Sequence, residues 1–329
     1  MSGSLGMKAA PIRLAFLLIP KFSMMSFSAA IEPLRSANRQ SGKVLYEWEL
    51  VSVDGRAVEA SNGIEIRVDR SVDAIAKLNM LVVCVSLEPT QPVGGRRLLH
   101  TLRRLARHGC RVGAISGGTF LLAQAGLLAD RRCTVHWEFA ELFRAIYPRL
   151  ELVRDLYVVD RDVFTCSGGT AALDLMLYFV REHFGAALAL SVAEQFLHPR
   201  IREHGDHQRM DVQTRYGVPE SRLADAIRLM ESTLSDPLPI DEIAHRIGLS
   251  SRQVERLFGT QLGVTPRRFY LTLRVERARL LLQQGSRSVR EVAFECGFAS
   301  SSHFCHVYRG AFQHSPTVDR RRLSVHAGG

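Results

Sequence analysis

The 329-residue chain lacks the features that assign a protein to the membrane, zinc-binding or disulfide-rich classes. It contains no run of about eighteen apolar residues, so we expect no membrane span. Its six cysteines form no C-x-x-C pair, and neither a zinc site nor a disulfide framework is indicated. Such cysteines suit a reducing compartment, and we expect a cytoplasmic protein with no metal or other cofactor.

A secretory signal is also lacking, although the chain opens on MSGSLGMKAAPIRLAFLLIP. The apolar run in this stretch is only about eight residues long, and it continues into KFSMMSF without an A-x-A cleavage site. We therefore expect a short disordered leader followed by a first buried strand.

Lysine is absent from residues 218–329, which contain 16 arginines and 11 acidic residues. The net charge of this segment is +5, and residues 1–217 carry the same charge over nearly twice the length. The higher density of positive charge favours a polyanionic partner for the C-terminal part.

Apolar runs alternate with helical patterns over the first 200 residues. Near-continuous apolar strands between helices indicate a mostly parallel sheet covered on both faces, which is a doubly wound α/β domain. The predicted strands are Ile12–Ile19, Trp48–Val53, Met80–Val85, Arg111–Ile115 and Leu156–Val159. The predicted helices include Phe27–Gln40, Arg96–His108, Thr119–Ala125, Glu138–Ile146 and Ala171–His183.

A polar segment, HPRIREHGDHQRMDVQTRYGVP, separates this domain from an all-helical region. We place the α/β domain at residues 10–197, a linker at 198–218 and the helical domain at 219–322. The charged run Arg202–Arg215 is interpreted as a solvated face of the linker.

The helical region contains an internal repeat. Residues 243–266 read IAHRIGLSSRQVERLFGTQLGVTP, and residues 292–316 read VAFECGFASSSHFCHVYRGAFQHSP. Each copy has an apolar residue beside alanine, then a glycine, a polar patch, a second helix and a closing Thr-Pro or Ser-Pro. The glycine-to-proline distance is 18 residues in one copy and 19 in the other, so the copies differ by one insertion.

Each copy predicts two short helices joined by a glycine turn. In the first copy Gly248 ends one helix, and Ser250 caps the next. Apolar spacing then turns three residues of each second helix inward: Val254, Leu257 and Phe258 in the first copy, and Phe304, Val307 and Tyr308 in the second. The outward residues are Ser251, Arg252, Glu255 and Arg256, and in the second copy Ser301, Ser302, Cys305, His306 and Arg309. Such a pair is typical of a helix-turn-helix motif, which places its second helix in the major groove of DNA.

A longer helix, PRRFYLTLRVERARLLLQQG, joins the two copies. Its apolar stripe runs through Leu271, Val275, Ala278 and Leu282. At 1.5 Å per residue the helix is roughly 28 Å long, and adjacent turns of the major groove lie about 34 Å apart. Two recognition helices can therefore enter adjacent turns of one duplex. The alternative is a plain helical bundle with solvated arginines, which the two copies and the spacer disfavour.

Residues 220–322 resemble the DNA-binding domain of AraC/XylS-family transcription regulators, through IAHRIGLSSRQVERLF, LGVTPRRF, RARLLL, VREVAFECGFASSSHF and SP. The family usually has glycine at Gln313 and tyrosine at Asp319, so the end of the second unit is expected to pack atypically. The resemblance implies DNA and RNA polymerase as partners.

Base contacts are expected mainly from Arg252 and Arg256, since arginine donates two bonds to a guanine edge. Arg267, Arg268 and Arg309 are expected at phosphates. The remaining residues assigned to DNA binding are Ser251, Ser301, Ser302 and His306.

The stretch AISGGTFLLAQAGLLADRRCTVHWE has the strand–turn–helix plan of a nucleophile elbow, with Ser116 at the turn and His136 twenty residues later. Its surroundings resemble the class I glutamine amidotransferase-like fold of the PfpI type, and more closely the copy found in GlxA-type regulators. The matching segments are FLLIPKFSMMSFSAAIEPLRSANR, AISGGTFLLAQAGLL, RRCTVHWEFAELF and FTCSGGTAALDLML.

Catalytic members of that fold need a cysteine at the elbow, a nearby histidine and, in many cases, a carboxylate in the first strand–helix turn. Here the elbow residue is Ser116, which needs an aligned base, and the turn PKFSMMSF contains no carboxylate. Glu32 is interpreted as a structural acid at a helix end or an interface, and Cys166 as a small buried side chain. We therefore predict no catalytic residue and no enzyme.

The elbow can instead bind a ligand. Backbone N–H groups of Ser116, Gly117 and Gly118 at a helix start favour an anion, and the face of Trp137 beside His136 suits a cation. The resemblance implies a small amine, amino acid or betaine-like effector, and we expect a zwitterion whose carboxylate faces the elbow. That Trp137 is simply a core residue remains an open alternative. The segment SGGTAALDLM is expected to form a strand-to-helix turn near this pocket.

These expectations describe a transcription regulator, an activator, that dimerises through its N-terminal domain and binds two adjacent major-groove segments. Ligand binding would shift the placement of the two DNA-binding domains, which requires different affinities for two states. The alternatives are an amidase or peptidase that uses Ser116 and is fused to a DNA-binding domain, and a repressor.

Overall fold

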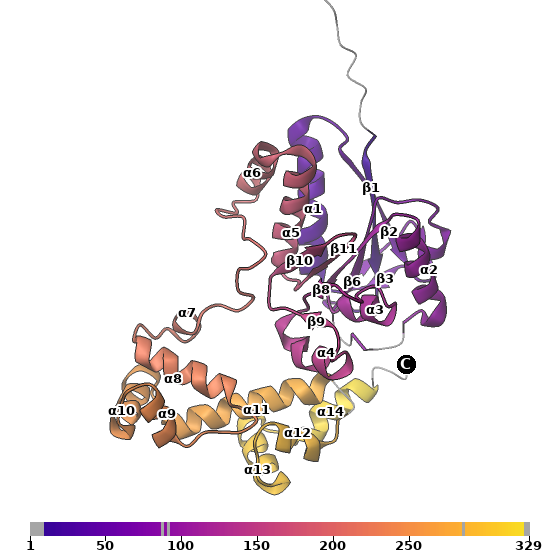
Figure 1. Cartoon of the computed structure of the whole chain (residues 1–329). Coiled ribbons are helices and arrows are strands. Elements are labelled where there is room, and N and C mark those ends of the chain that lie inside the picture. The colour runs from indigo at the N-terminus through magenta and orange to yellow at the C-terminus, as the bar shows by residue number, and fades with distance from the viewer. Residues whose placement is uncertain (1–9, 87–88, 91–92, 285–286, 326–329) are drawn as a thin grey trace, which may run out of the picture. The chain divides into compact units, whose positions relative to one another are not determined.

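Figure 1 shows the computed structural model, which describes residues 10–86, 89–90, 93–284 and 287–325. The chain divides into two compact units, Met1–Gln208 and Arg209–Gly329. The predicted leader lies outside the described residues. Among the helices that are described, none is both long and apolar enough to cross a membrane.

The first unit is built on a seven-stranded sheet of order β10-β11-β7-β6-β1-β2-β5. Its neighbours are parallel except β10 and β11, which pair antiparallel at one edge. The strands are β1 (Ile12–Leu18), β2 (Tyr46–Ser52), β5 (Arg70–Ser71), β6 (Met80–Val85), β7 (Arg111–Ser116), β10 (Tyr157–Asp160) and β11 (Val163–Cys166). Two small sheets pair β3 (Val58–Glu59) with β4 (Glu65–Ile66) and β8 (Arg132–Cys133) with β9 (Glu151–Leu152).

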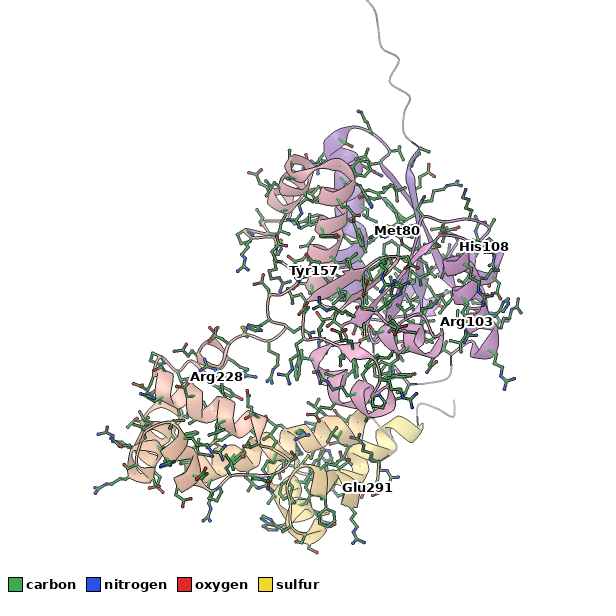
Figure 2. The ribbon with its side chains drawn as sticks, viewed as in Figure 1. Met80, Arg103, His108, Tyr157, Arg228 and Glu291 are labelled. Atoms are coloured by element: carbon green, nitrogen blue, oxygen red, sulfur yellow. The ribbon has the colours of Figure 1, made fainter. Side chains whose placement is uncertain are left out.

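Helices cover both faces of the large sheet (Figure 1). One face carries α1 (Met24–Ser41), α5 (Ala171–Phe184) and α6 (Ala186–Gln195), and the other carries α2 (Gly95–Arg107), α3 (Thr119–Gln124) and α4 (Ala140–Ile146). Short 3₁₀ helices span Val72–Ala74 and Trp137–Phe139. Alternate residues of β1 enter the two cores, and Met80 of β6 is labelled among these side chains in Figure 2. The predicted doubly wound α/β fold is confirmed.

Helix α1 begins where the Ser23 hydroxyl accepts a bond from the Ser26 N–H at 3.2 Å. It continues through Pro33 and ends at Gly42, whose φ of 64° is left-handed. Glu32 lies in the middle of this helix and pairs with Arg35 at 2.7 Å. Glu32 is therefore not at a helix end, which was one of its two expected positions, and its interpretation as a structural acid stays a prediction.

The described part of the second unit is helical throughout. Its helices are α7 (Val212–Tyr216), α8 (Ser221–Ser232), α9 (Ile240–Arg246), α10 (Ser251–Leu262), α11 (Pro266–Gln284), α12 (Val289–Glu295), α13 (Ser301–Phe312) and α14 (Pro316–Val325). The helical half of the predicted fold class is thus also confirmed.

Helix α11 belongs to two cores. Its first half contributes Tyr270 and Leu273 to a core with α8, α9 and α10. Its second half contributes Val275, Ala278 and Leu282 to a core with α12 and α13. Because one helix is buried in both cores, it fixes the separation of the two helix-turn-helix units.

Candidate functional site

Each helix-turn-helix unit turns at a glycine in the left-handed region. Gly248 has φ of 71° and Gly297 has φ of 74°. Ser250 then caps α10 in a capping box with Gln253, and Ser300 caps α13 by accepting from the His303 N–H at 3.2 Å. The sequence repeat is therefore also a repeat of backbone geometry.

The outer faces of α10 and α13 differ in the length of their side chains. On α10, Arg252 and Arg256 are exposed, and Ser251 is half-buried at the start of the helix. On α13, the exposed residues are Ser302, His306 and Arg309, and Ser301 is half-buried. Cys305, which was expected on this face, instead packs against the second core. Of the inward residues, Leu257 and Val307 are only partly buried.

Two further arginines lie at the beginning of α11. Arg267 and Arg268 directly follow Pro266 and are both exposed. Exposed arginines at a helix start place positive charge where a phosphate can approach, although the Arg268 N–H already donates to the Thr265 hydroxyl at 3.3 Å. The structure thus places five arginines of the proposed DNA-binding set on the surface.

In each helix-turn-helix unit, an arginine of another helix donates a hydrogen bond to the turn between the two helices. The sequence patterns did not identify either arginine. Arg222 of α8 donates to the carbonyl of Ile247 at 2.9 Å, and Arg274 of α11 donates to the carbonyl of Cys296 at 2.8 Å. Both carbonyls immediately precede the turn glycine. The two arginines lie 26 and 23 residues before their glycines, so unequal loops hide this repeat in the sequence.

In the first unit, Ser116 occupies a strained turn at the end of β7. Its φ is 57° and it is buried. A Cβ on Gly118 would lie 2.5 Å from the Val83 carbonyl oxygen, and a Cβ on Gly168 would lie 2.8 Å from the Ser116 Cβ. Small residues are therefore required around the serine, as in a nucleophile elbow.

The backbone N–H groups of the two elbow glycines already have hydrogen-bond partners. Gly117 N–H donates to the Val85 carbonyl at 3.1 Å, and Gly118 N–H donates to the Ile115 carbonyl at 3.0 Å. Helix α3 that follows is only six residues long. The expected cradle for a carboxylate at Gly117 and Gly118 is therefore contradicted, because these N–H groups complete the strand-to-helix turn.

His136 and Trp137 lie on a neighbouring segment. The Thr119 hydroxyl donates to the Thr134 carbonyl at 2.8 Å and so joins this segment to the start of α3. Burial lowers the pKa of His136, which Glu138 only partly offsets, so the ring is neutral at pH 7. The rings of His136 and Trp137 lie 5.5 Å apart, and both residues are half-buried. Among the described residues, no hydrogen bond joins the Ser116 hydroxyl to His136 or to a carboxylate.

The turn SGGT between β11 and α5 packs against the elbow, as predicted. Gly168 contacts Ser116, and Gly169 N–H donates to the Ser26 hydroxyl of α1 at 2.7 Å. Cys166 is fully buried, and burial raises the pKa of its thiol to about 12. The thiol is therefore neutral, and the prediction of a buried structural cysteine agrees with its environment. Within the described part of the chain, no group of histidine, cysteine and acidic residues could hold a metal.

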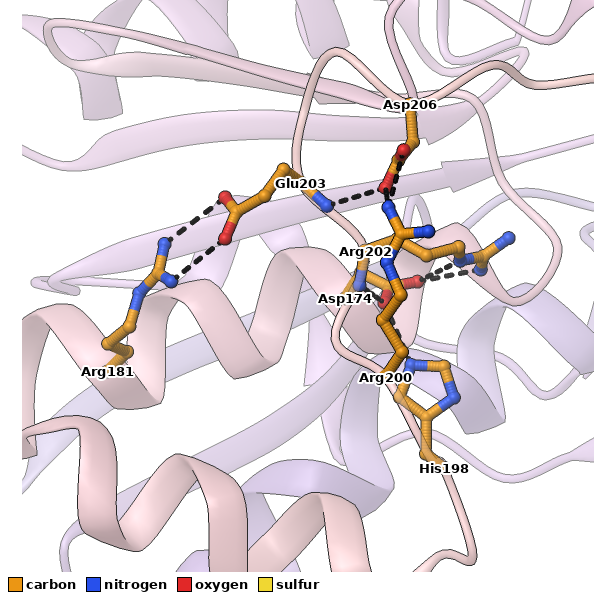
Figure 3. A network of polar contacts seen from close by, with 7 residues as sticks. All are labelled: Asp174, Arg181, His198, Arg200, Arg202, Glu203 and Asp206. Atoms are coloured by element: carbon orange, nitrogen blue, oxygen red, sulfur yellow. Dashed lines mark hydrogen bonds and ion pairs between the residues drawn. The ribbon is translucent and has the colours of Figure 1, made fainter.

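The first half of the predicted linker is bound to the α/β unit (Figure 3). The buried carboxylate of Asp174 on α5 accepts bonds from the Arg202 backbone N–H at 2.7 Å and from its guanidinium at 2.7 and 2.9 Å. It also lies 2.9 Å from His198 Nε2. Arg202 further donates to the Thr170 hydroxyl, at the end of the SGGT turn, at 2.8 Å.

A second attachment lies at Gln208. Its amide nitrogen donates to the Thr134 hydroxyl at 3.0 Å, to the Val135 carbonyl at 3.2 Å and to the Asp155 carbonyl at 2.9 Å. Residues 198–208 are thus bonded both to the turn behind Ser116 and to the segment that leads into His136. These attachments were not predicted, because a charged run gives no sign of which side chain it contacts.

Comparison with known proteins matches both units. A model of the DJ-1/PfpI family matches residues 13–182, and a helix-turn-helix domain model matches residues 243–322. The HTH-type transcriptional regulator CdhR of Pseudomonas aeruginosa is 44% identical over 95% of this chain and 92% of its own length. GbdR of the same species is 40% identical over 94% and 84%, and GlxA of Rhizobium meliloti is 35% identical over 94% and 96%.

A solved structure gives the same result for the first unit. An AraC family transcriptional regulator from Pseudomonas putida is 31% identical, covers 56% of this chain with its whole length, and has a TM-score of 0.52. A ThiJ/PfpI family protein from Pseudomonas syringae has a TM-score of 0.52 at 18% identity, which shows a shared fold alone.

Proposed function

The chain belongs to the AraC-type helix-turn-helix transcriptional regulators that carry a DJ-1/PfpI-family domain, and we propose that it is an activator controlled by a small molecule bound in that domain. In this family the DJ-1/PfpI-like domain is regulatory, and the chain is not an enzyme.

For DNA, we propose that α10 and α13 enter adjacent turns of the major groove, with α11 as the spacer. Arg252 and Arg256 read bases, and Arg267, Arg268 and Arg309 hold phosphates. The support is that these arginines are exposed while the apolar faces of both helices are buried.

The experiment is an operator titration of the full chain with Arg252→Ala. We expect a loss of about 1–3 kcal/mol at one base position. Arg228→Ala is the matched control, since Arg228 is an exposed arginine of α8, labelled in Figure 2, and pairs with Asp225. Unchanged operator affinity of the Arg252 variant would refute the placement of α10.

For the effector, we propose a small amine, amino acid or betaine-like compound that contacts Ser116, His136 and Trp137. The support is the half-buried face of Trp137 next to a neutral imidazole, which favours a cation over the indole. Because the N–H groups of Gly117 and Gly118 already donate to backbone carbonyls, we do not place the carboxylate of the effector at those two residues.

Tryptophan fluorescence tests this proposal sharply, because the chain has only two tryptophans, Trp48 and Trp137. In a Trp48→Phe chain the remaining signal comes from Trp137, and we expect it to change with a quaternary amine or amino acid. A Trp137→Phe chain is the matched control and should give no change. If no such compound alters fluorescence or melting temperature, the proposed effector class is wrong.

The observation that supports ligand control is the double attachment of residues 198–208, to the SGGT turn beside Ser116 and to the segment that leads into His136. A ligand that moves either the turn or this segment changes the bonds of Arg202 or Gln208, and the chain continues from there into the DNA-binding unit. Activation also requires RNA polymerase and, in our proposal, a homodimer formed in the cytoplasm through the first unit. A promoter fusion assayed with and without the gene distinguishes an activator from a repressor.

A further inference from the structure

The two helix-turn-helix units differ at the contact between each recognition helix and the helix that follows it. Pro266 starts α11 after the first unit, and Pro316 starts α14 after the second. The third residue beyond the proline is Phe269 in one case and Asp319 in the other. A partly buried aromatic side chain in the first unit is thus replaced by a carboxylate in the second.

In the first unit this contact is apolar. The Phe269 ring meets the Phe258 ring of α10 at 5.3 Å between centroids, with the planes 66° apart. Edge-to-face aromatic contacts are set by ring packing and are less directional than hydrogen bonds. They hold α10 against its core without fixing its rotation sharply.

In the second unit Tyr308 takes the place of Phe258 on the buried face of the recognition helix. Its hydroxyl donates to Asp319 Oδ2 at 2.5 Å. The same oxygen lies 2.8 Å from His314 Nε2 and 3.3 Å from Arg279 Nε. The groups around it therefore come from α11, α13, α14 and the loop that precedes α14.

The Asp319 side chain is fully buried. Burying a carboxylate is costly unless charges and donors compensate it. Burial opposes ionisation, yet Tyr308, His314 and Arg279 together hold the pKa of Asp319 below its ordinary value. Because hydrogen bonds are directional, this cluster fixes the rotation of α13 more closely than a ring contact can.

The recognition face of α13 needs such precision more than that of α10 does. Arg252 and Arg256 are long side chains that can adjust to a shifted helix, whereas the hydroxyls of Ser301 and Ser302 extend only one atom beyond Cβ. A small rotation of α13 would carry a serine out of hydrogen-bond range of a base edge.

We propose that Asp319 is a positioning residue for DNA recognition, which acts through Tyr308 to set the rotation of α13. This rests on the proposed DNA contacts of α13. The proposal predicts that loss of the Tyr308 hydroxyl, on the buried face of α13, weakens base selection by the exposed face of the same helix.

The test is selection of bound duplexes from a double-stranded DNA library with a randomised core, using the full chain. The wild type should select two segments about one helical turn apart. His306→Ala identifies the segment read by α13, and Arg252→Ala identifies the one read by α10. If His306→Ala changes neither segment, the proposed DNA contacts of α13 fail, and the positioning role fails with them.

Tyr308→Phe removes only the hydroxyl. We expect base discrimination in the α13 segment to fall by about fivefold to a hundredfold, with the α10 segment unchanged. The double variant Tyr308→Phe with Asp319→Phe copies the apolar pair of the first unit and removes the buried charge. It should show the same loss of selection with less effect on melting temperature.

Tyr270→Phe is the matched control, because it removes a phenol hydroxyl that donates to the Thr233 carbonyl at 2.9 Å in the first core. In this variant the DNA segment selected by α13 should be unchanged. Retention of both segments in Tyr308→Phe would overturn the proposal. Equal loss of both segments, in step with a lower melting temperature, would also overturn it, because Asp319 would then act on stability alone.

Discussion

At the scale of single residues, the elbow keeps the strained geometry of a reactive turn without the partners of a reactive serine. Ser116 has φ of 57°, a conformation that costs roughly 1–2 kcal/mol for a residue with a Cβ. The surrounding glycines and the neighbouring SGGT turn hold it there. Strain of this kind persists only where the surroundings impose it.

The SGGT turn allows a direct measurement of this close packing. Gly168→Ala places a Cβ 2.8 Å from the Ser116 Cβ at φ of 96°, so we expect the free energy of unfolding to fall by about 2–3 kcal/mol. Gly169→Ala is the control: its φ is 58° but no atom lies within 4 Å of the added Cβ, so it should cost about 1 kcal/mol. If denaturant titrations gave the same loss of unfolding free energy for both variants, the close contact between Gly168 and Ser116 would be contradicted.

His136 predicts a dependence of stability on pH. Burial lowers the pKa of His136 in the folded state, so the unfolded state binds a proton more readily. The contribution of this residue is therefore complete above the unfolded pKa of about 6.5 and is lost as pH falls through the lower, folded value.

Urea unfolding of wild type and His136→Gln at several pH values below 7 checks this. The variant should lose less stability on acidification than the wild type. His108→Gln, at an exposed histidine, controls for removal of an imidazole. Parallel curves for wild type and His136→Gln would show that the ring does not resist protonation.

At the scale of elements, the arginine behind each turn links a long helix to the helix-turn-helix in front of it. Arg274 donates to the Cys296 carbonyl and lies over the Phe298 ring at 4.1 Å. Arg222 makes the corresponding bond to Ile247. The two arginines thus make the same bond at the same position of the repeat, but each does so beside a different hydrophobic core.

We expect Arg274→Met to destabilise the α12–α13 turn by about 1–3 kcal/mol, because a carbonyl loses a charged donor. Hydrogen exchange should quicken in that turn and stay unchanged in the α9–α10 turn. Arg222→Met should give the reverse pattern. Faster exchange in both turns for either variant would mean that the two units open together.

These elements also show what the sequence could predict. Apolar spacing predicted α10, α11 and α13 and their outward arginines, because burial on one helix face leaves a period in the sequence. It did not separate β11 from β10, since only Arg161 and Asp162 lie between these two strands of four residues each. The sequence also could not show that the Gly117 N–H donates to the Val85 carbonyl, because this bond depends on how β7 lies beside β6. The attachments of Arg202 and Gln208 depend likewise on tertiary contacts.

At the scale of the whole molecule, residues 198–208 predict how ligand binding and DNA binding can be separated. Gln208→Ala removes the contacts of the Gln208 amide nitrogen with the Thr134 hydroxyl, the Val135 carbonyl and the Asp155 carbonyl. We expect it to bind effector and operator as the wild type does, yet to lose the response of a promoter fusion to effector. Arg202→Ala should do the same at a larger cost in stability, because it leaves Asp174 buried with fewer partners.

Arg200→Ala is the matched control for this segment. Arg200 is mostly exposed and pairs with Asp206 inside the same stretch (Figure 3). Its promoter response should remain normal. A normal response in Gln208→Ala and Arg202→Ala would place the coupling elsewhere.

Helix α14 has a consequence for how the second unit is organised. It lies against α13 through Asp319 as α11 lies against α10 through Phe269, so it begins the repeat a third time. By this contact α14 covers the buried side of α13, in the way that a terminal capping element covers the last repeat of a repeat protein.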